Sequence, residues 1–183
     1  MSTEDEGGLV ARAKAMDDAA WAHLLHAYYP RLRTYIWNRI GDDGAAEDLA
    51  AQVFEEAVVR IGDYEWRGLP FGAWLFRIAR NISTDFVRKR ARRTGVAFEP
   101  AEQAPLGRGL EQRVETQQLR EALQQLNDEQ RQVVVLRFMS GLSTEEAGVV
   151  MNKSTGAIKA IQHRALRAMR RALDQIDPMF RGG

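Results

Sequence analysis

The chain has 183 residues, of which 45% are hydrophobic, 28% are charged and none is cysteine. This composition suits one or two globular domains, and it excludes wholesale disorder, disulfide bonds, thiolate metal sites and cysteine nucleophiles. No apolar run approaches the roughly 18 residues of a membrane span, and the acidic N-terminus MSTEDEGG lacks the apolar core of a signal peptide. We therefore expect a cytoplasmic protein without a membrane segment.

The net charge of +1 conceals an uneven distribution along the chain. Residues 68–95 carry seven basic and one acidic side chains, and residues 129–183 carry nine basic and five acidic ones. The segments 1–67 and 96–128 are both acidic. Two basic blocks separated by acidic sequence indicate two surfaces that bind a polyanion, and a solvated helix face is the alternative for either block.

Helical periodicity dominates the first half of the chain and predicts an all-α fold. Residues 1–16 are expected to be disordered, and residues 17–93 to form an N-terminal helical domain. Helices are predicted over residues 17–28, 30–40, 45–61 and 71–92. Pro30 is expected to separate the first two of these helices, and a turn at 41–44 to separate the second from the third.

Periodicity fails between residues 94 and 110, where glycines and prolines cluster. This segment is predicted to be a flexible linker between two domains. Beyond it, helices are predicted over residues 111–126, 128–139, 144–151 and 155–173. Residues 111–176 are therefore predicted to form a smaller C-terminal helical domain, followed by a tail over 177–183.

The C-terminal domain carries the signature of a helix-turn-helix. Ser143 and Glu146 form a capping box at the start of a short helix, and Asn152 tolerates the left-handed conformation of a tight turn after it. Ser154 then caps a longer, basic helix. A short helix, a tight turn and a long basic helix follow the plan of DNA-binding helix-turn-helix domains.

The long basic helix has two contrasting faces at 100° per residue. Its apolar arc holds Ile158, Ile161, Ala165, Leu166, Met169 and Leu173, and its opposite arc holds Gly156, Lys159, His163, Arg164, Arg167, Arg170 and Arg171. Such a helix can enter a major groove, with its first residues at base edges and its arginines at phosphates. The alternative is an ordinary amphipathic helix with a solvated basic face.

The helix over 71–92 shows the same division. One of its arcs holds Arg77, Arg80, Asn81, Thr84 and Arg88, with Lys89 following, and an aromatic loop with Tyr64, Trp66 and Phe71 precedes it. Exposed rings beside arginines suit unpaired bases, because each ring offers a stacking platform worth about 1–3 kcal/mol per base. For Trp66 and Phe71 the alternative is core packing at the start of the helix.

The helix over 45–61 carries an acidic stripe with one apolar residue, formed by Asp48, Gln52, Glu55 and Val59. This stripe would repel DNA and could dock a protein partner, and a solvated face is the alternative. The chain shows no phosphate-binding glycine loop, zinc-protease motif or nucleophile elbow. His23 and His26 lack a third ligand, so we expect no catalytic residue, no metal, no cofactor and no enzymatic activity.

Taken together, these residues resemble an extracytoplasmic-function (ECF) sigma factor of bacterial RNA polymerase. The first matching motif is Ala46-Glu47-Asp48-Leu49 with Phe54, then Phe71, Trp74-Leu75, Ile78-Ala79-Arg80-Asn81 and Asp85. The second runs from Leu126 to Arg137 and continues through Ser143, Glu146, Gly156, Ile158-Lys159 and His163-Arg164-Ala165. The resemblance covers almost the whole chain, from Asp17 to Leu173.

The resemblance implies that 17–93 is sigma region 2, 111–176 is sigma region 4, and the partners are core RNA polymerase and promoter DNA. The −10 element would be bound by Tyr64, Trp66, Phe71, Arg77, Arg80, Asn81, Thr84, Arg88 and Lys89. The −35 element would be read by Ser154, Thr155, Lys159, His163, Arg164 and Arg167. Core polymerase would be contacted by Asp48, Leu49, Gln52 and Glu55. An anti-sigma protein is a further candidate partner.

The main alternative is a helix-turn-helix regulator that binds an operator as a dimer and uses its N-terminal domain to dimerise or to sense a ligand. It predicts a stable homodimer and tight binding to duplex DNA without polymerase. The sigma-factor interpretation predicts instead that polymerase performs all the catalysis, while this chain selects the promoter and helps to open it.

Overall fold

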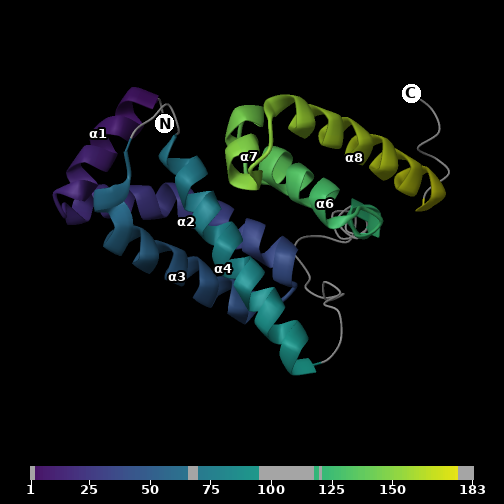
Figure 1. Ribbon diagram of the computed structural model, residues 1–183, viewed down its shortest axis with the longest axis horizontal. Coiled ribbons are helices and arrows are strands. Elements are labelled where there is room, and N and C mark those ends of the chain that lie inside the picture. The colour runs from purple at the N-terminus through teal and green to yellow at the C-terminus, as the bar shows by residue number, and fades with distance from the viewer. Residues whose placement is uncertain (1–2, 66–69, 95–117, 120, 177–183) are drawn as a thin grey trace, which may run out of the picture.

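The computed structural model describes residues 3–65, 70–94, 118–119 and 121–176, and in these residues the chain forms helices and no strand (Figure 1). The labelled helices are α1 (Thr3–Lys14), α2 (Asp18–Ile40), α3 (Asp43–Arg60), the 3-10 helix η1 (Ile61–Asp63), α4 (Phe71–Thr94), α6 (Asp128–Val134), the π-helix η2 (Val135–Met139), α7 (Thr144–Met151) and α8 (Thr155–Ile176). Residues 118–119 and 121–124 are also helical. The predicted all-α fold with a C-terminal helix-turn-helix is confirmed. The predicted linker lies almost wholly outside the described residues, as does the predicted tail.

Side-chain caps explain where the N-terminal helices begin and end. The Asp17 carboxylate accepts hydrogen bonds from the backbone N–H groups of Ala19 and Ala20, and the Asp42 carboxylate accepts one from that of Ala45. Both aspartates thereby satisfy N–H groups that a helix start leaves free. Gly41 ends α2 at φ 64°, in the left-handed conformation that glycine adopts without strain.

The segment 1–16, predicted to be disordered, is helical from Thr3 onward. Val10 and Ala13 in α1 are buried, and the indole N–H of Trp21 donates to the carbonyl of Ala13 at 3.1 Å. An ion pair of 2.8 Å between Arg12 and Asp17 joins α1 to the start of α2. The prediction was wrong because the few apolar residues of this segment are enough to pack it against α2.

The predicted break at Pro30 is also wrong, because α2 runs unbroken from Asp18 to Ile40 with Pro30 inside it. Proline lacks the N–H that would bond to the carbonyl one turn earlier, which normally destabilises a helix interior. Buried residues on both sides of Pro30, among them Tyr28 and Leu32, anchor the helix in the core. Tertiary packing therefore outweighs the local preference of proline.

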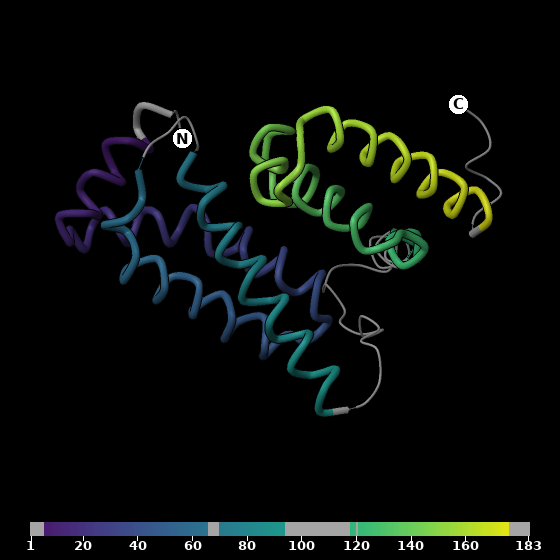
Figure 2. The backbone as a smooth tube through the Cα atoms, in the orientation of Figure 1, coloured from purple at the N-terminus to yellow at the C-terminus, as the bar shows by residue number. Residues whose placement is uncertain are grey.

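The C-terminal helices lie against one side of the α2–α4 bundle (Figure 2). α7 contacts α4, and η2 contacts α2. Buried side chains of the two domains form one continuous hydrophobic cluster, to which Leu136 and Leu142 contribute from the C-terminal side. The Arg31 guanidinium spans the boundary, donating from Nε to the carbonyl of Ser140 at 2.7 Å. The two domains are therefore packed together in this structure.

Candidate nucleic-acid interface

The turn between α7 and α8 has the geometry of a helix-turn-helix. Ser143 and Glu146 form the predicted capping box at the start of α7, and Asn152 ends it in the left-handed conformation at φ 55° and ψ 49°. A Cβ on Gly148 would lie 2.8 Å from the carbonyl oxygen of Lys153, so only glycine allows this close approach. The hydroxyl of Ser154 accepts a hydrogen bond from the N–H of Ala157 at 3.2 Å and caps α8.

The two faces of α8 separate largely as the sequence predicts, except that Leu166, predicted in the apolar arc, is 43% exposed. The buried side chains of α8 are Ile158, Ile161, Ala165, Met169 and Ala172. Four of the six residues predicted to read the −35 element are exposed along the opposite side: Lys159, His163, Arg164 and Arg167. Ser154 is exposed and acts as a cap, and Thr155 is half-buried. Gln162 accepts a hydrogen bond from Arg137 at 3.3 Å.

Charges around α8 favour a negatively charged ligand. Arg164, Arg167 and Arg171 line a shallow groove of about 270 Å³ with Gln130 from α6. At the start of α7, hydrogen bonds from its own backbone N–H and from the Ser143 hydroxyl lower the pKa of Glu145, and Lys159 and Arg137 lower it further by their positive charge. The three arginines give this groove a positive charge.

The basic arc of α4 is only partly exposed. Arg77, Asn81, Arg88 and Lys89 are exposed. Arg80 is half-buried and donates from Nε to the side-chain carbonyl of Gln132 in α6 at 3.5 Å. Thr84 is also half-buried and accepts a hydrogen bond of 3.0 Å from Arg39 in α2. Of the surface that the sequence assigns to DNA, the C-terminal domain thus contacts Arg80, and Thr84 is held within the N-terminal domain.

The aromatic loop differs from its prediction as a set of exposed stacking platforms. Tyr64 is 4% exposed and Phe71 is fully buried, with their ring centroids 5.5 Å apart at 87°. Trp74 packs against both rings. The Tyr64 and Phe71 assignments are therefore wrong, because the start of α4 needs these rings to close the core beneath α1 and α2. Trp66 lies outside the described residues.

The outer face of α3 presents the predicted acidic stripe. Asp48, Gln52 and Glu55 are exposed, and Val59, which lies on the same face, is 83% exposed. Leu49, also assigned to polymerase, is 8% exposed and belongs to the hydrophobic core. That assignment is wrong for Leu49, because its side chain points into the core, on a different side of α3 from Asp48.

Two arginines of α2 at the domain boundary were not found from the sequence. The Arg31 guanidinium lies over the rings of Tyr28 and Phe76, at 5.2 and 5.8 Å from their centroids. The Arg39 guanidinium lies 3.9 Å from the Asp128 carboxylate of α6. No sequence signal separates them from surface arginines, because their partners are about 90 to 110 residues away in the chain.

A metal-binding cluster and a membrane-spanning helix are both absent from the described residues. No group of three potential ligands could hold a metal ion there, and His23 bonds instead to the carbonyl of Ala19 in its own helix. Among the described helices, none carries an apolar stretch that would span a bilayer.

The fold and the site together define a two-domain helical protein whose helix-turn-helix presents a cationic groove. The Sigma-70 region 2 family matches residues 24–93, and the Sigma-70, region 4 family matches residues 122–171. The ECF RNA polymerase sigma factor ShbA of Streptomyces griseus is 32% identical over 182 residues, which cover 92% of this chain and 95% of ShbA. The chain belongs to the ECF RNA polymerase sigma factors.

Two further relatives agree with this family assignment. The ECF RNA polymerase sigma factor BldN of Streptomyces coelicolor is 38% identical over 171 residues, and the match covers 90% of this chain and 64% of BldN. The chain therefore spans less than two thirds of that relative. SigW of Bacillus subtilis is 29% identical over 177 residues, covering 90% of this chain and 94% of SigW. These matches do not favour the alternative of a dimeric operator-binding regulator.

Solved structures share the fold. CnrH, in complex with the cytosolic domain of CnrY, superposes with a TM-score of 0.73 at 24% identity, covering 94% of this chain and 99% of CnrH. RpoE of Bartonella quintana, in complex with the anti-sigma factor NepR, superposes with a TM-score of 0.71 at 29% identity, covering 84% of this chain and 96% of RpoE.

Proposed function

We propose that this chain binds core RNA polymerase, brings it to promoters and divides promoter recognition between two surfaces. Residues 17–93 act as region 2, residues 111–176 act as region 4, and residues 94–110 link them. The chain supplies contacts only, the polymerase catalyses RNA synthesis, and both act in the cytoplasm. The observation that carries the proposal is the cationic face of α8, positioned by the close turn at Gly148.

The −35 surface is the exposed side of α8. Its first turn, with Lys159, lies next to the turn and meets base edges in the major groove. Arg164 and Arg167, further along the helix, contact phosphates and set the register. His163, between these two groups, is exposed and contacts either base edges or phosphates.

The −10 surface is the exposed part of α4, with Arg77, Asn81, Arg88 and Lys89. These side chains hold the backbone of an unpaired strand, which offsets the cost of about 1.4 kcal/mol for each base-pair step that opens. Arg80 joins this surface only after its contact with Gln132 breaks. Contact of Arg80 with the promoter therefore requires this link to the C-terminal domain to break.

The partner surface for polymerase is the outer face of α3, formed by Asp48, Gln52, Glu55 and Val59. An exposed apolar side chain on the same helix face as two carboxylates suits a basic helical surface on a protein and repels DNA. An anti-sigma protein is proposed as a further partner, since the structure of the related RpoE contains one.

Transcription from a cognate promoter with purified core polymerase tests the proposal. Arg77→Ala combined with Asn81→Ala should lower the rate of open-complex formation at least about tenfold, because it removes contacts made only to the opened strand. Lys159→Ala should weaken promoter binding before opening. Arg33→Ala on α2, whose ion pairs with Asp43 and Glu47 stay within the N-terminal domain, is the control. If the Arg77/Asn81 double variant and Lys159→Ala both behave like the wild type and the control, the assignment of both surfaces is wrong.

A further inference from the structure

The helix α8 packs on the rest of the C-terminal domain mainly through apolar side chains. Ile158 and Ile161 are buried in one hydrophobic cluster, and Ala165 and Met169 are buried in another. Apolar burial has no preferred direction, so it fixes the rotation of a helix less sharply than a hydrogen bond between two defined atoms does. A side chain that reads a ligand has to be held within about 0.5 Å and 10–20° of its productive geometry.

One polar side chain of α8 has a partner on another helix. Gln162 is half-buried and lies one turn after Ile158 and one turn before Ala165, both of which are buried. Its side-chain carbonyl accepts a hydrogen bond of 3.3 Å from Nε of Arg137 in η2. Within the part of the chain that the structure describes, no other hydrogen bond or ion pair links a side chain of α8 to another helix. The Arg137–Gln162 pair is therefore the directional contact that α8 makes with its own domain there.

Arg137 is itself held by the start of α7. Its Nη1 donates a hydrogen bond to the carbonyl of Leu142, the residue directly before the Ser143 cap. The N–H of Leu142 donates to the carbonyl of Leu136 at 2.9 Å, so this acceptor is part of a fixed backbone. Because the guanidinium is planar and presents its donors in a rigid fork, Arg137 ties the start of α7 to the middle of α8. These are the two helices of the helix-turn-helix.

Gln162 lies in the same turn of α8 as residues that the proposed function places at the −35 element. Lys159 is three residues before Gln162, and His163 follows it directly. Residues three or four positions apart are neighbours on a helix surface. A rotation of α8 that breaks the Arg137–Gln162 bond would therefore move Lys159 and His163 relative to the base edges.

We propose that Arg137 is a positioning residue for −35 recognition, which acts through Gln162 to fix the rotation of α8 on α7. Arg137 reads no base itself. Lys159 and His163 do so, in the orientation that the Arg137–Gln162 pair maintains. This inference rests on the proposed function of α8.

Binding of the holoenzyme to two promoters tests this role. One is a cognate promoter, the other is the same promoter with its −35 element replaced, and the ratio of the two dissociation constants measures discrimination. Gln162→Leu removes the acceptor but keeps a side chain of similar size, and it should lower the ratio at least about fivefold. Gln162→Glu keeps an acceptor that binds a guanidinium more strongly, so the ratio should stay within about twofold of the wild type. The added negative charge should weaken binding to both promoters.

Arg137→Met removes the donor of the same bond. It should lower the ratio as Gln162→Leu does, and the double variant should lower it no further, because the two changes remove one shared interaction.

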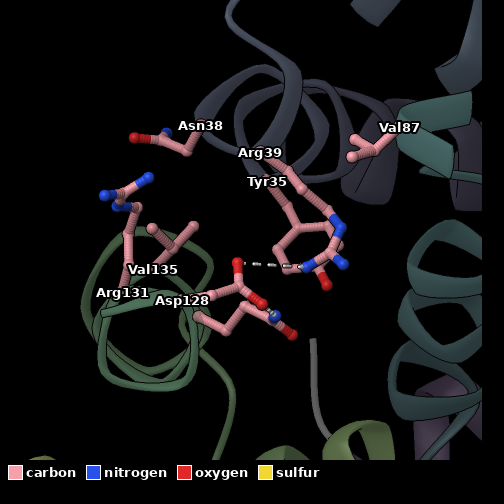
Figure 3. A pocket seen from close by; sticks show the side chains of 8 residues that line it. Tyr35, Asn38, Arg39, Val87, Asp128, Arg131 and Val135 are labelled. Atoms are coloured by element: carbon pink, nitrogen blue, oxygen red, sulfur yellow. Dashed lines mark hydrogen bonds and ion pairs between the residues drawn. The ribbon is translucent and has the colours of Figure 1, made fainter. Parts of the chain in front are cut away.

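Arg131→Met in α6 is the matched control. Arg131 is also half-buried and donates to backbone carbonyls, those of Leu123, Gln124 and Leu126. It lines a cavity between the two domains with Asn38 of α2 and bonds to no residue of α8 (Figure 3). Arg131→Met should therefore lower the melting temperature and leave the discrimination ratio unchanged, which separates a loss of stability from a loss of positioning.

Three results would overturn the proposal: equal ratios for Gln162→Leu and Gln162→Glu, a further loss in the double variant, or a loss of affinity by Arg137→Met that is the same on both promoters. The last would make Arg137 a phosphate contact instead. Gln162→Leu decides the question even if Arg137→Met fails to fold, because it leaves the bond to Leu142 in place.

Lys159→Ala distinguishes this inference from the proposed function. If Lys159→Ala leaves the ratio unchanged, the proposed reading of the −35 element by α8 fails, and this inference fails with it. If Lys159→Ala lowers the ratio and Gln162→Leu does not, only the positioning role of Arg137 fails.

Discussion

Gly148 determines how closely α7 approaches the turn that leads into α8. Its carbonyl accepts a hydrogen bond of 2.8 Å from the N–H of Lys153, and the space above its Cα is filled by the carbonyl of that same residue. A backbone oxygen cannot move aside as a flexible side chain can. The sequence showed a glycine near the end of a short helix, but not this need for it, because the contact depends on the path of the turn.

We expect Gly148→Ala to lower the free energy of unfolding by about 1–3 kcal/mol, since its Cβ would force the turn apart. Gly156→Ala is the matched control, because a Cβ at Gly156 meets nothing within 4 Å and alanine favours a helix by up to about 1 kcal/mol. Urea unfolding followed by circular dichroism measures both changes. Equal changes in the two variants would contradict the close contact at Gly148.

At the scale of elements, local signals predict helix ends well and helix interiors less well. Caps are local hydrogen bonds, so they can be predicted from a few neighbouring residues. The capping box at Ser143 correctly predicted the start of α7, Asn152 its end, and the cap at Ser154 the start of α8. Pro30 and segment 1–16 were misjudged, because packing against distant residues decides both. Tyr64 and Phe71 were misassigned for the same reason, since burial is not a local property.

The cationic face of α8 makes a quantitative prediction about salt. A plot of the logarithm of the promoter-binding constant against the logarithm of the salt concentration has a slope that reports the number of phosphate contacts. Arg164→Ala and Arg167→Ala should each reduce this slope by about 0.9, because each variant loses one phosphate contact. Arg60→Ala on α3, whose ion pair with Glu56 lies within its own helix, is the control. Fluorescence anisotropy of the holoenzyme on a labelled promoter, across a series of salt concentrations, measures the slopes. An unchanged slope in both α8 variants would remove α8 from the phosphate contacts.

At the scale of the whole molecule, the sequence predicted two domains but not how they pack. The packing of the two domains is stabilised by long-range contacts such as Arg31 with Ser140 and Arg80 with Gln132. The second of these contacts involves Arg80, which the sequence assigns to the −10 element. Under the proposed function, Arg80 reaches promoter DNA only after its contact with Gln132 breaks.

Arg31→Ala should loosen the closed state, because it removes the hydrogen bond to Ser140 and the stacking on Tyr28. A compact chain of this length has a radius of gyration of about 16 Å. Small-angle scattering should give a value near that for the wild type and for the control Arg33→Ala, and a larger value for Arg31→Ala. A wild-type value already far above it would show that the domains are separate in solution.

Cleavage of promoter DNA by a tethered iron chelate tests the central claim, that α8 and α4 contact different elements of one promoter. The chain has no cysteine, so single cysteines at Ala160 on α8 and Asp85 on α4, both exposed, direct the cleavage. In the holoenzyme, the account predicts cuts near the −35 element from position 160 and near the −10 element from position 85. Cuts at the same element from both positions, or no cuts from either, would contradict it.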